Sequence, residues 1–185
     1  TIYAYADRPA ADLVAQADLT ATPDLLTALP ITDLASIPRP SATWKTGQRI
    51  GFDLLVRPLV RVNSAIAGTD PEGKDITISK GSEIDAYLAA VLRGNDTTRE
   101  ATYLDWLTQR ISGAMLDPDT TRMASFQRRK IKRNGQRLDG PDAVFHGTLT
   151  ITEPEAFTAM LAKGVGRHRT YGYGMLLLRP PQRAR

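Results

Sequence analysis

The residues that could do chemistry gather near the carboxyl end, in the stretch GVGRHRTYGYGML at positions 164–176. Its four glycines leave backbone N–H groups uncovered, and Arg167, His168 and Arg169 lie between them with up to three positive charges. Exposed N–H groups and cationic side chains together bind phosphate oxygens. The stretch therefore predicts an anion-binding loop.

Two other interpretations of the glycines compete with this one. A nucleotide-binding loop places its glycines after a strand and before a helix, so that phosphate meets the helix N-terminus. Here Gly164 and Gly166 follow a predicted helix while Gly172 and Gly174 enter a predicted strand, which argues against an ATP or NAD site. A helix cap followed by a strand in close backbone contact with a neighbour stays open as an alternative.

A second cationic stretch, RMASFQRRKIKRNGQR, occupies positions 122–137. It predicts two strands, 122–132 and 136–151, joined at Asn134-Gly135, a dipeptide typical of tight hairpin turns. Strand alternation places cations on both faces, so neither face can be buried and the hairpin is expected to project. It could contact the backbone of a folded RNA, and the alternative is a solvated edge that repels other strands.

The candidate RNA-binding residues come from both stretches. Tyr171 and Tyr173 could stack on a base, although strand alternation makes a core position at least as reasonable for both. The full candidate set is Arg128, Arg129, Lys130, Lys132, Arg133 and Arg137 in the hairpin, with Gly164, Gly166, Arg167, His168, Arg169, Tyr171, Gly172 and Gly174 in the loop.

No other pattern indicates catalysis or metal binding. The two histidines, His146 and His168, lack the spacing of metal ligands, and Asp117 and Asp119 are typical turn residues. The absence of cysteine excludes disulfides, thiolate catalysis and cysteine-ligated zinc. We therefore expect no metal and no cofactor, and we assign no catalytic residue.

Composition and charge indicate a polyanionic partner. With 42% hydrophobic and 24% charged residues in 185, the composition is that of a soluble globular protein, and no apolar run could span a membrane. Residues 122–185 carry 13 Lys and Arg against 4 Asp and Glu, whereas residues 1–121 carry 11 against 16. This segregation favours nucleic acid over a membrane surface as the partner, and the cytoplasm is the expected compartment.

The elements that must position these residues follow the order β-α-β-β-α-β. Residues 48–62 predict a long strand bent at Pro58, AGTDPEGKD predicts a loop, and residues 83–112 predict two helical pieces broken at Gly94. A helix after TITEPEAF begins with capping-box spacing between Thr152 and Glu155, ends at Gly164 and leads into a last strand over YGYGMLLLR. This is the ferredoxin-like order of RNA-recognition modules.

The first 46 residues predict a smaller unit. TIYAYA is strand-like, residues 12–17 and 22–29 tolerate helix with Thr22-Pro23 as a helix start, and one further strand is possible. We therefore predict an α+β fold of tandem ferredoxin-like (RRM-like) domains. Residues 1–46 are the C-terminal part of an incomplete N-terminal domain, and residues 47–185 form a complete C-terminal RNA-binding domain.

Several stretches together resemble one protein family. They are GQRIGFDLLVRPLVRV, the basic hairpin, VFHGTLTITEPEAF, and GVGRHRTYGYGMLLLRP with its pattern G-[IV]-G-x-x-[KR]-x-x-G-x-G-[LM]-L. The chain is similar over nearly its whole length to the CasE family, the CRISPR-RNA-processing endoribonucleases of type I-E Cascade complexes.

The resemblance implies a function. CasE proteins bind the repeat stem-loop of pre-crRNA, cut at the 3′ base of the stem by metal-independent attack of the ribose 2′-hydroxyl, and stay bound as a subunit of Cascade, meeting target DNA only through that complex. They carry the catalytic histidine in the first helix of the N-terminal domain. TIYAYADRP resembles a later strand, so about 60 residues of that domain are expected to precede Thr1. A non-catalytic RNA-binding or scaffold subunit is the alternative.

Overall fold

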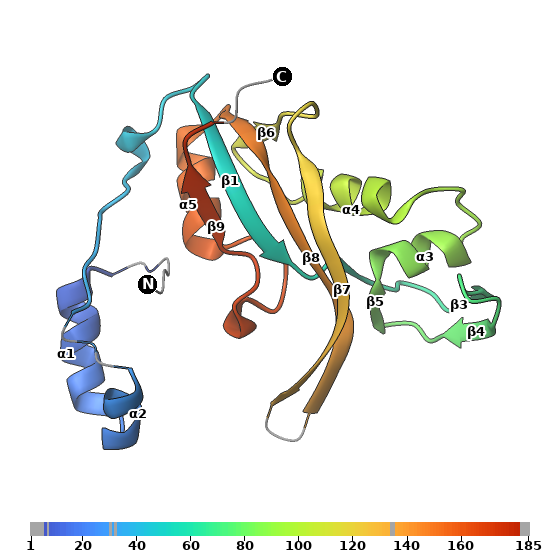
Figure 1. Ribbon diagram of the computed structural model, residues 1–185, viewed down its shortest axis with the longest axis horizontal. Helices are drawn as coiled ribbons and strands as arrows, with labels where there is room; N and C mark the ends of the chain where they lie inside the picture. Colours follow the sequence, from blue (N-terminus) through green and yellow to red (C-terminus); the bar gives the residue numbers. More distant parts are fainter. Residues whose placement is uncertain (1–5, 7, 30, 32, 134–135, 182–185) are drawn as a thin grey trace.

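The computed structural model describes residues 6, 8–29, 31, 33–133 and 136–181, and for residues 131–133 and 136–138 it describes the backbone alone. The central antiparallel sheet has the order β9 (Leu176–Arg179), β1 (Arg49–Val56), β8 (Gln136–Ile151), β7 (Arg122–Arg133) (Figure 1). β6 (Ala114–Leu116) pairs with the end of β8 on the same side as β7. With its helices this is the ferredoxin-like order, which confirms the predicted α+β class.

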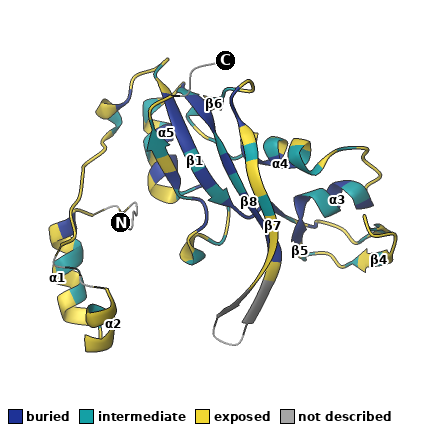
Figure 2. Cartoon of the chain, viewed as in Figure 1, coloured by how far each residue is buried: buried dark blue, intermediate teal, exposed yellow. Residues whose placement is uncertain are grey.

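Alternation along β1 buries one face of this sheet. Ile50, Phe52 and Leu54 point to that face, where α4 (Arg99–Thr108) and α5 (Pro154–Lys163) cover it. Figure 2 shows the buried strands at the centre and exposed residues along β7. The helices contribute Tyr103, Trp106, Leu107, Phe157, Met160 and Leu161 to this core.

The connection from the first strand to the second holds the two predicted helical pieces. α3 (Ala86–Leu92) ends before Gly94, whose φ of +78° breaks the helix, and α4 begins after Thr98. The Asp85 carboxylate accepts the amide N–H of Tyr87 at 2.8 Å and so caps α3. The predicted break at Gly94 is therefore confirmed.

The start of α5 differs from the predicted capping box. Glu153, and not Thr152, is the N-cap residue, and its side chain makes no capping hydrogen bond. The reason is tertiary, because the amides of Thr152 and Glu153 both donate to the carbonyl of Gly113 at 2.9 and 3.0 Å. The chain is thereby held by a neighbouring loop where a capping box would have been needed.

The predicted strand over residues 48–62 is divided at Arg57 and Pro58. β2 (Leu59–Arg61) leaves the central sheet and pairs with β5 (Glu83–Asp85) in a separate two-stranded sheet. Proline fixes φ and has no N–H to donate, so the ladder of β1 cannot continue through it. The bend places β5 close to the carboxyl-terminal glycine-rich stretch.

The predicted loop AGTDPEGKD is instead a hairpin. β3 (Ile66–Thr69) pairs with β4 (Asp75–Ile78), and the Asp70 carboxylate accepts the amide N–H groups of Glu72 and Lys74 at 3.0 and 2.8 Å. The hairpin packs apolar residues of both strands on a second small core of Val62, Ile84, Ala89 and Leu92. The Asp, Pro and Gly of the turn concealed the short strands on either side.

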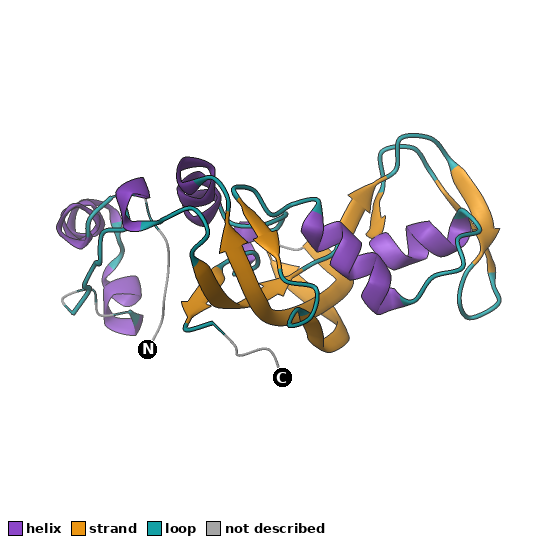
Figure 3. Ribbon diagram, turned by 90° about the horizontal axis from the view of Figure 1, so that it is seen from above, coloured by secondary structure: helices purple, strands orange, loops and turns teal. Residues whose placement is uncertain are grey.

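The amino-terminal segment contains α1 (Ala10–Thr20), α2 (Pro23–Ala28) and the 3-10 turn Ser41–Thr43. Thr22 caps α2 as predicted, but the described part of residues 1–46 contains no strand, and the strand-like residues 1–5 lie outside the described residues. Figures 1 and 3 place α1 and α2 at the opposite end of the sheet from α3 and α4. Of the helices in the described chain, none has the length and apolarity needed to cross a bilayer.

Candidate nucleic-acid interface

The glycine-rich stretch forms a loop that leaves α5 and returns to the sheet. Positive φ angles occur at all four of its glycines and at His168, where φ is +60°. The loop closes on itself through the Val165 amide, which donates to the carbonyl of Gly174 at 2.7 Å, and Gly174 donates to the carbonyl of Leu55 at 2.7 Å. The predicted last strand is thus shorter than expected, because β9 begins only at Leu176.

Two of the glycines are required by close approach. A Cβ at Gly174 would lie 2.2 Å from the carbonyl oxygen of Val165, and one at Gly166 would lie 2.8 Å from the ring of Trp106. Gly172 has no atom within 4 Å of its would-be Cβ and is required only by its φ of +87°. The alternative interpretation, a helix cap with close backbone contact, therefore accounts for the conformation, and contact of these glycines with RNA stays a prediction.

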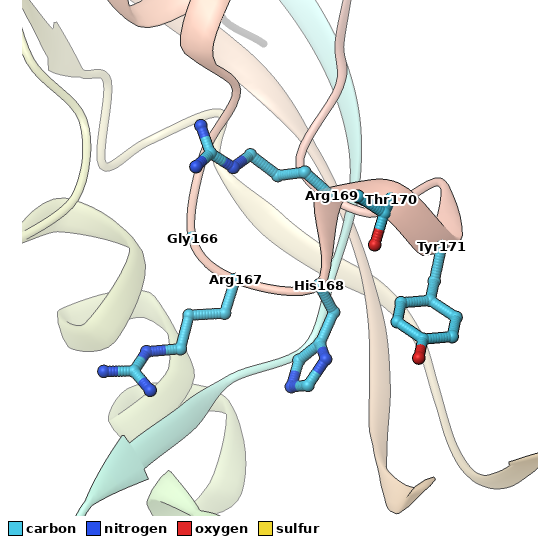
Figure 4. Close-up of a pocket in the computed structure, with 6 residues that line it drawn as sticks. All are labelled: Gly166, Arg167, His168, Arg169, Thr170 and Tyr171. Atoms are coloured by element: carbon cyan, nitrogen blue, oxygen red, sulfur yellow. The ribbon is translucent and has the colours of Figure 1, made fainter. Parts of the chain in front are cut away.

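The loop surrounds an open cavity of about 480 Å³, lined by residues 166–171 (Figure 4). Arg167 and His168 point to the same side of the loop, while Arg169 extends the other way and donates to the carbonyl of Lys163. Tyr171 lies in the 3-10 turn Arg169–Tyr171, with its ring 6.0 Å from that of His168. The cavity is therefore cationic with one aromatic side chain at its rim.

One carboxylate reaches this cationic side. Glu83 of β5 forms an ion pair with Arg167, and one of its carboxylate oxygens, Oε2, lies 3.4 Å from Nε2 of His168. Burial lowers the pKa of His168 below its ordinary value, and the charges of Arg57 and Arg167 lower it further. The imidazole is therefore neutral near pH 7, so the charge that pairs with Glu83 here is that of Arg167 and not that of His168.

A buried ionic network lies between the loop and the hairpin, and the sequence analysis missed it. Arg57 and Asp142 are 1% and 2% exposed, and the Arg57 Nε atom lies 3.2 Å from the Asp142 carboxylate. The Tyr173 hydroxyl donates to the same carboxylate at 2.7 Å, and Arg57 donates to the carbonyl of Arg129 at 2.9 Å. Burial and the hydrogen bond to Asp142 raise the pKa of Tyr173 to about 12, so it keeps its proton.

This network joins three segments that are distant in the sequence. Arg57 directly follows β1, Asp142 and Arg129 lie at the base of the hairpin, and Tyr173 lies in the last part of the glycine-rich loop. The Arg57 guanidinium lies 5.2 Å from the centre of the Tyr173 ring, so Tyr173 has the core position that strand alternation allowed. The sequence VRP places a charged residue, Arg57, at the end of an apolar strand, which indicates a buried charge. This pattern does not identify the carboxylate that pairs with Arg57.

The hairpin projects beyond the sheet, as predicted (Figure 1). Residues 136–141 of β8 pair with β7 alone. Arg128 is 60% exposed and pairs loosely with Asp139, at 3.5 Å, while Arg129 is 55% exposed and reaches Asp142 at 3.4 Å. Lys132, Arg133 and Arg137 continue the ladder, but their side chains and the turn Asn134-Gly135 lie outside the description.

The helix-free face of the sheet differs from a base-stacking platform. In its described central strands the side chains on that face include Asp53, Leu55 and His146, with no aromatic residue. Phe126 of β7 packs on the helix side, 6.0 Å from the ring of Tyr103. The loop and the hairpin are thus the cationic surfaces, and within the described residues no group of three His, Asp or Glu side chains could hold a metal ion.

Comparison with known proteins gives matches of family and of fold. The sequence model described as CRISPR associated protein matches residues 2–180. The structure of the CRISPR endoribonuclease Cse3 bound to 19 nt RNA aligns with a TM-score of 0.54 at 21% identity, covering 82% of this chain and 68% of that one. Cse3 from Thermus thermophilus, bound to an RNA representing a pre-cleavage complex, aligns with a TM-score of 0.50 at 23% identity.

The second alignment covers 80% of this chain and 59% of the Thermus protein, so the chain spans about three-fifths of that relative. A comparison with curated proteins found no match. The family match and these two folds confirm the resemblance inferred from the sequence and the predicted α+β, ferredoxin-like class. The assignment of residues 1–46 to an incomplete N-terminal ferredoxin-like domain stays a prediction.

Proposed function

Because this chain belongs to the family of CRISPR-associated proteins, we propose that it binds the repeat stem-loop of CRISPR RNA through the glycine-rich loop and the basic hairpin. One observation carries the proposal: the Arg57–Asp142–Tyr173 network fixes the cationic loop and the base of the cationic hairpin to each other. Two cationic elements in fixed positions suit a folded RNA, whose phosphates have fixed spacing.

We further propose cleavage at the 3′ base of the stem. The ribose 2′-oxygen attacks the adjacent phosphorus, the bond to the 5′-oxygen of the next nucleotide breaks, and a cyclic phosphate and a 5′-hydroxyl result. This step needs no metal ion. The matched structures named above are of CRISPR endoribonucleases, which supports the reaction class, while the groups that move the protons are not assigned to residues of this chain.

We further propose that the protein stays bound to its product after cleavage, as a subunit of a type I-E Cascade complex. A complex held by many phosphate contacts dissociates slowly, and slow dissociation suits a subunit that retains its product. The partners are accordingly crRNA and the other Cascade subunits.

The experiment uses the protein expressed from its complete open reading frame and a labelled repeat stem-loop RNA in EDTA. One cut at the stem base is expected, and a 2′-deoxy substitution at the scissile position should block cutting and leave the dissociation constant nearly unchanged. Tight binding with intact RNA would instead identify a non-catalytic scaffold subunit. A second RNA of the same composition that forms no stem serves as the unfolded control. If the protein binds neither the stem-loop nor this control, the proposed function is refuted.

A further inference from the structure

Glu83 contacts Arg167 and His168 of the loop from a different part of the fold. It lies on β5, 84 residues from Arg167 in sequence, and reaches the loop only because the chain bends at Pro58. Its carboxylate pairs with Arg167 and lies 3.4 Å from His168. Arg167 is 51% exposed and Glu83 34%, so both ends of the pair are open to solvent and to a ligand.

Cationic side chains lie near Glu83. Arg167 pairs with it, and Arg61 stands opposite it on β2. The charge of Arg57 acts on the neighbouring His168, although Arg57 is itself paired with Asp142. At Arg167 the anionic partner is the Glu83 carboxylate. It lies at this guanidinium where an anionic ligand would bind.

A carboxylate and a phosphodiester make the same demand on this site. Each presents oxygens that accept hydrogen bonds from a guanidinium, often two at a time. Arg167 can form this pair of hydrogen bonds with one such group at a time. We propose that in the RNA-free protein Glu83 holds the place of one RNA phosphate at Arg167, and that bound RNA displaces it. This inference rests on the proposed function and adds that Glu83 competes with an RNA phosphate for Arg167.

The size of the effect follows from exposure. A pair with partly exposed partners is weak, so RNA displaces the carboxylate easily, and its removal should tighten binding by about threefold to fivefold. Because Glu83 is tethered beside Arg167, its effective concentration exceeds that of free anions in solution. Isolated anions are therefore excluded, whereas an RNA that makes many other contacts enters.

The test measures the dissociation constant of the repeat stem-loop for the wild-type chain and for Glu83→Gln, which keeps the shape and removes the charge. Glu72→Gln is the matched control, since it makes the same change of charge in the β3–β4 turn. We expect tightening of about threefold to fivefold for Glu83→Gln and clearly less for Glu72→Gln. Melting temperatures establish that each variant folds, and Glu83→Ser serves if the glutamine variant does not.

A double-mutant cycle with Arg167→Ala identifies the mechanism. If Glu83 competes at Arg167, the gain from Glu83→Gln disappears in the Arg167→Ala background. An equal gain in both backgrounds would reduce Glu83 to a long-range charge effect and overturn the inference. Unchanged or weaker binding by Glu83→Gln would also overturn it and make Glu83 a support for Arg167.

The two proposals fail in different ways. If the wild-type chain does not bind the stem-loop at all, both the proposed function and the competition by Glu83 are refuted. If the wild-type chain binds normally but Glu83→Gln does not bind more tightly, only the competition by Glu83 is refuted.

Discussion

Arg57 and Asp142 are charged side chains with almost no access to water, and each depends on the other. Asp142 accepts from Tyr173 and faces the guanidinium of Arg57, while Arg57 also donates to the backbone of the hairpin. An ion pair of this kind adds little stability in total, but removal of one partner leaves an uncompensated charge in the interior. The pair therefore makes the relative position of loop and hairpin specific.

Arg57→Ala should lower the free energy of unfolding by about 3 kcal/mol, because the buried Asp142 carboxylate loses its buried cationic partner and keeps only the half-exposed Arg129. Tyr173→Phe removes only one hydrogen bond to a charged group and should cost about 1.5 to 3 kcal/mol. Urea unfolding measures both, with the exposed Arg128→Ala as the control. Equal midpoints for Arg57→Ala and Arg128→Ala would show that the network does not hold the fold.

His168 should make stability depend on pH. Its pKa in the folded chain is lowered from 6.5, so below that pH the unfolded chain takes up a proton that the folded chain does not. The free energy of unfolding should therefore fall as the pH falls from about 7 to 5, and each pKa unit of difference contributes up to about 1.4 kcal/mol. His168→Asn, which tolerates the left-handed backbone, should flatten this slope. Parallel curves for the two proteins in urea unfolding would contradict the prediction.

At the scale of elements, the loop glycines separate two physical causes. Gly174→Ala places a Cβ 2.2 Å from the Val165 carbonyl oxygen and should open the loop, whereas Gly172→Ala meets nothing within 4 Å. We expect Gly172→Ala to cost about 1 kcal/mol from its positive φ alone, and Gly174→Ala to cost clearly more and to weaken RNA binding. Thermal unfolding and RNA titration of this matched pair test it. Equal losses would refute the role of the Val165–Gly174 contact.

The hairpin is expected to act through charge. Arg128→Ala with Lys130→Ala removes two cations from its projecting arm, so RNA affinity should fall and the slope of log K against log salt should flatten by about one to two units. Lys74→Ala with Lys80→Ala removes two cations elsewhere and serves as control. If the slope is unchanged in the hairpin variant, the hairpin does not contact RNA phosphates and is instead a solvated edge strand.

At the scale of the whole molecule, the amino-terminal segment and the sheet differ in how they are stabilised. α1 contributes Ala10 and α2 no buried residue, and Leu19 and Ile37 are 86% and 71% exposed. Trp44, by contrast, is 8% exposed and meets the Phe157 ring edge-on at 5.3 Å. Trp44 therefore packs with the ferredoxin-like domain, and the domain boundary that we predict at residue 47 stays a prediction.

Deletion of residues 1–38 should leave the melting temperature of the remaining chain nearly unchanged, because this segment adds little to the main core. Deletion of residues 1–46 also removes Trp44 and should cost about 3 to 5 kcal/mol, the usual loss for a buried tryptophan. Circular dichroism melts of both deletions test the boundary. A large loss in the shorter deletion would mean that α1 and α2 belong to the same folding unit.

The sequence by itself determined the β-α-β-β-α-β order of the main elements, the ends of the hairpin and the location of the cationic residues, but not the short strands β2 to β5. These features are local: alternation along 122–151, the Asn134-Gly135 turn dipeptide and the break at Gly94 each act over a few neighbouring residues. Where a local rule competed with a distant contact it failed, as at the start of α5, whose residues Thr152 and Glu153 are held by Gly113.

Only the tertiary structure decided which charges meet. Arg57 finds Asp142 because β1 and β8 are neighbours in the sheet. Glu83 finds Arg167 because β5 pairs with β2, which leaves the central sheet after Pro58. Ion pairs between distant segments leave no periodicity in the sequence, since any of many carboxylates could be the partner. The closing of the sheet removes water from one pair and leaves the other accessible, and this difference in solvation separates a structural pair from a site that can exchange its anion.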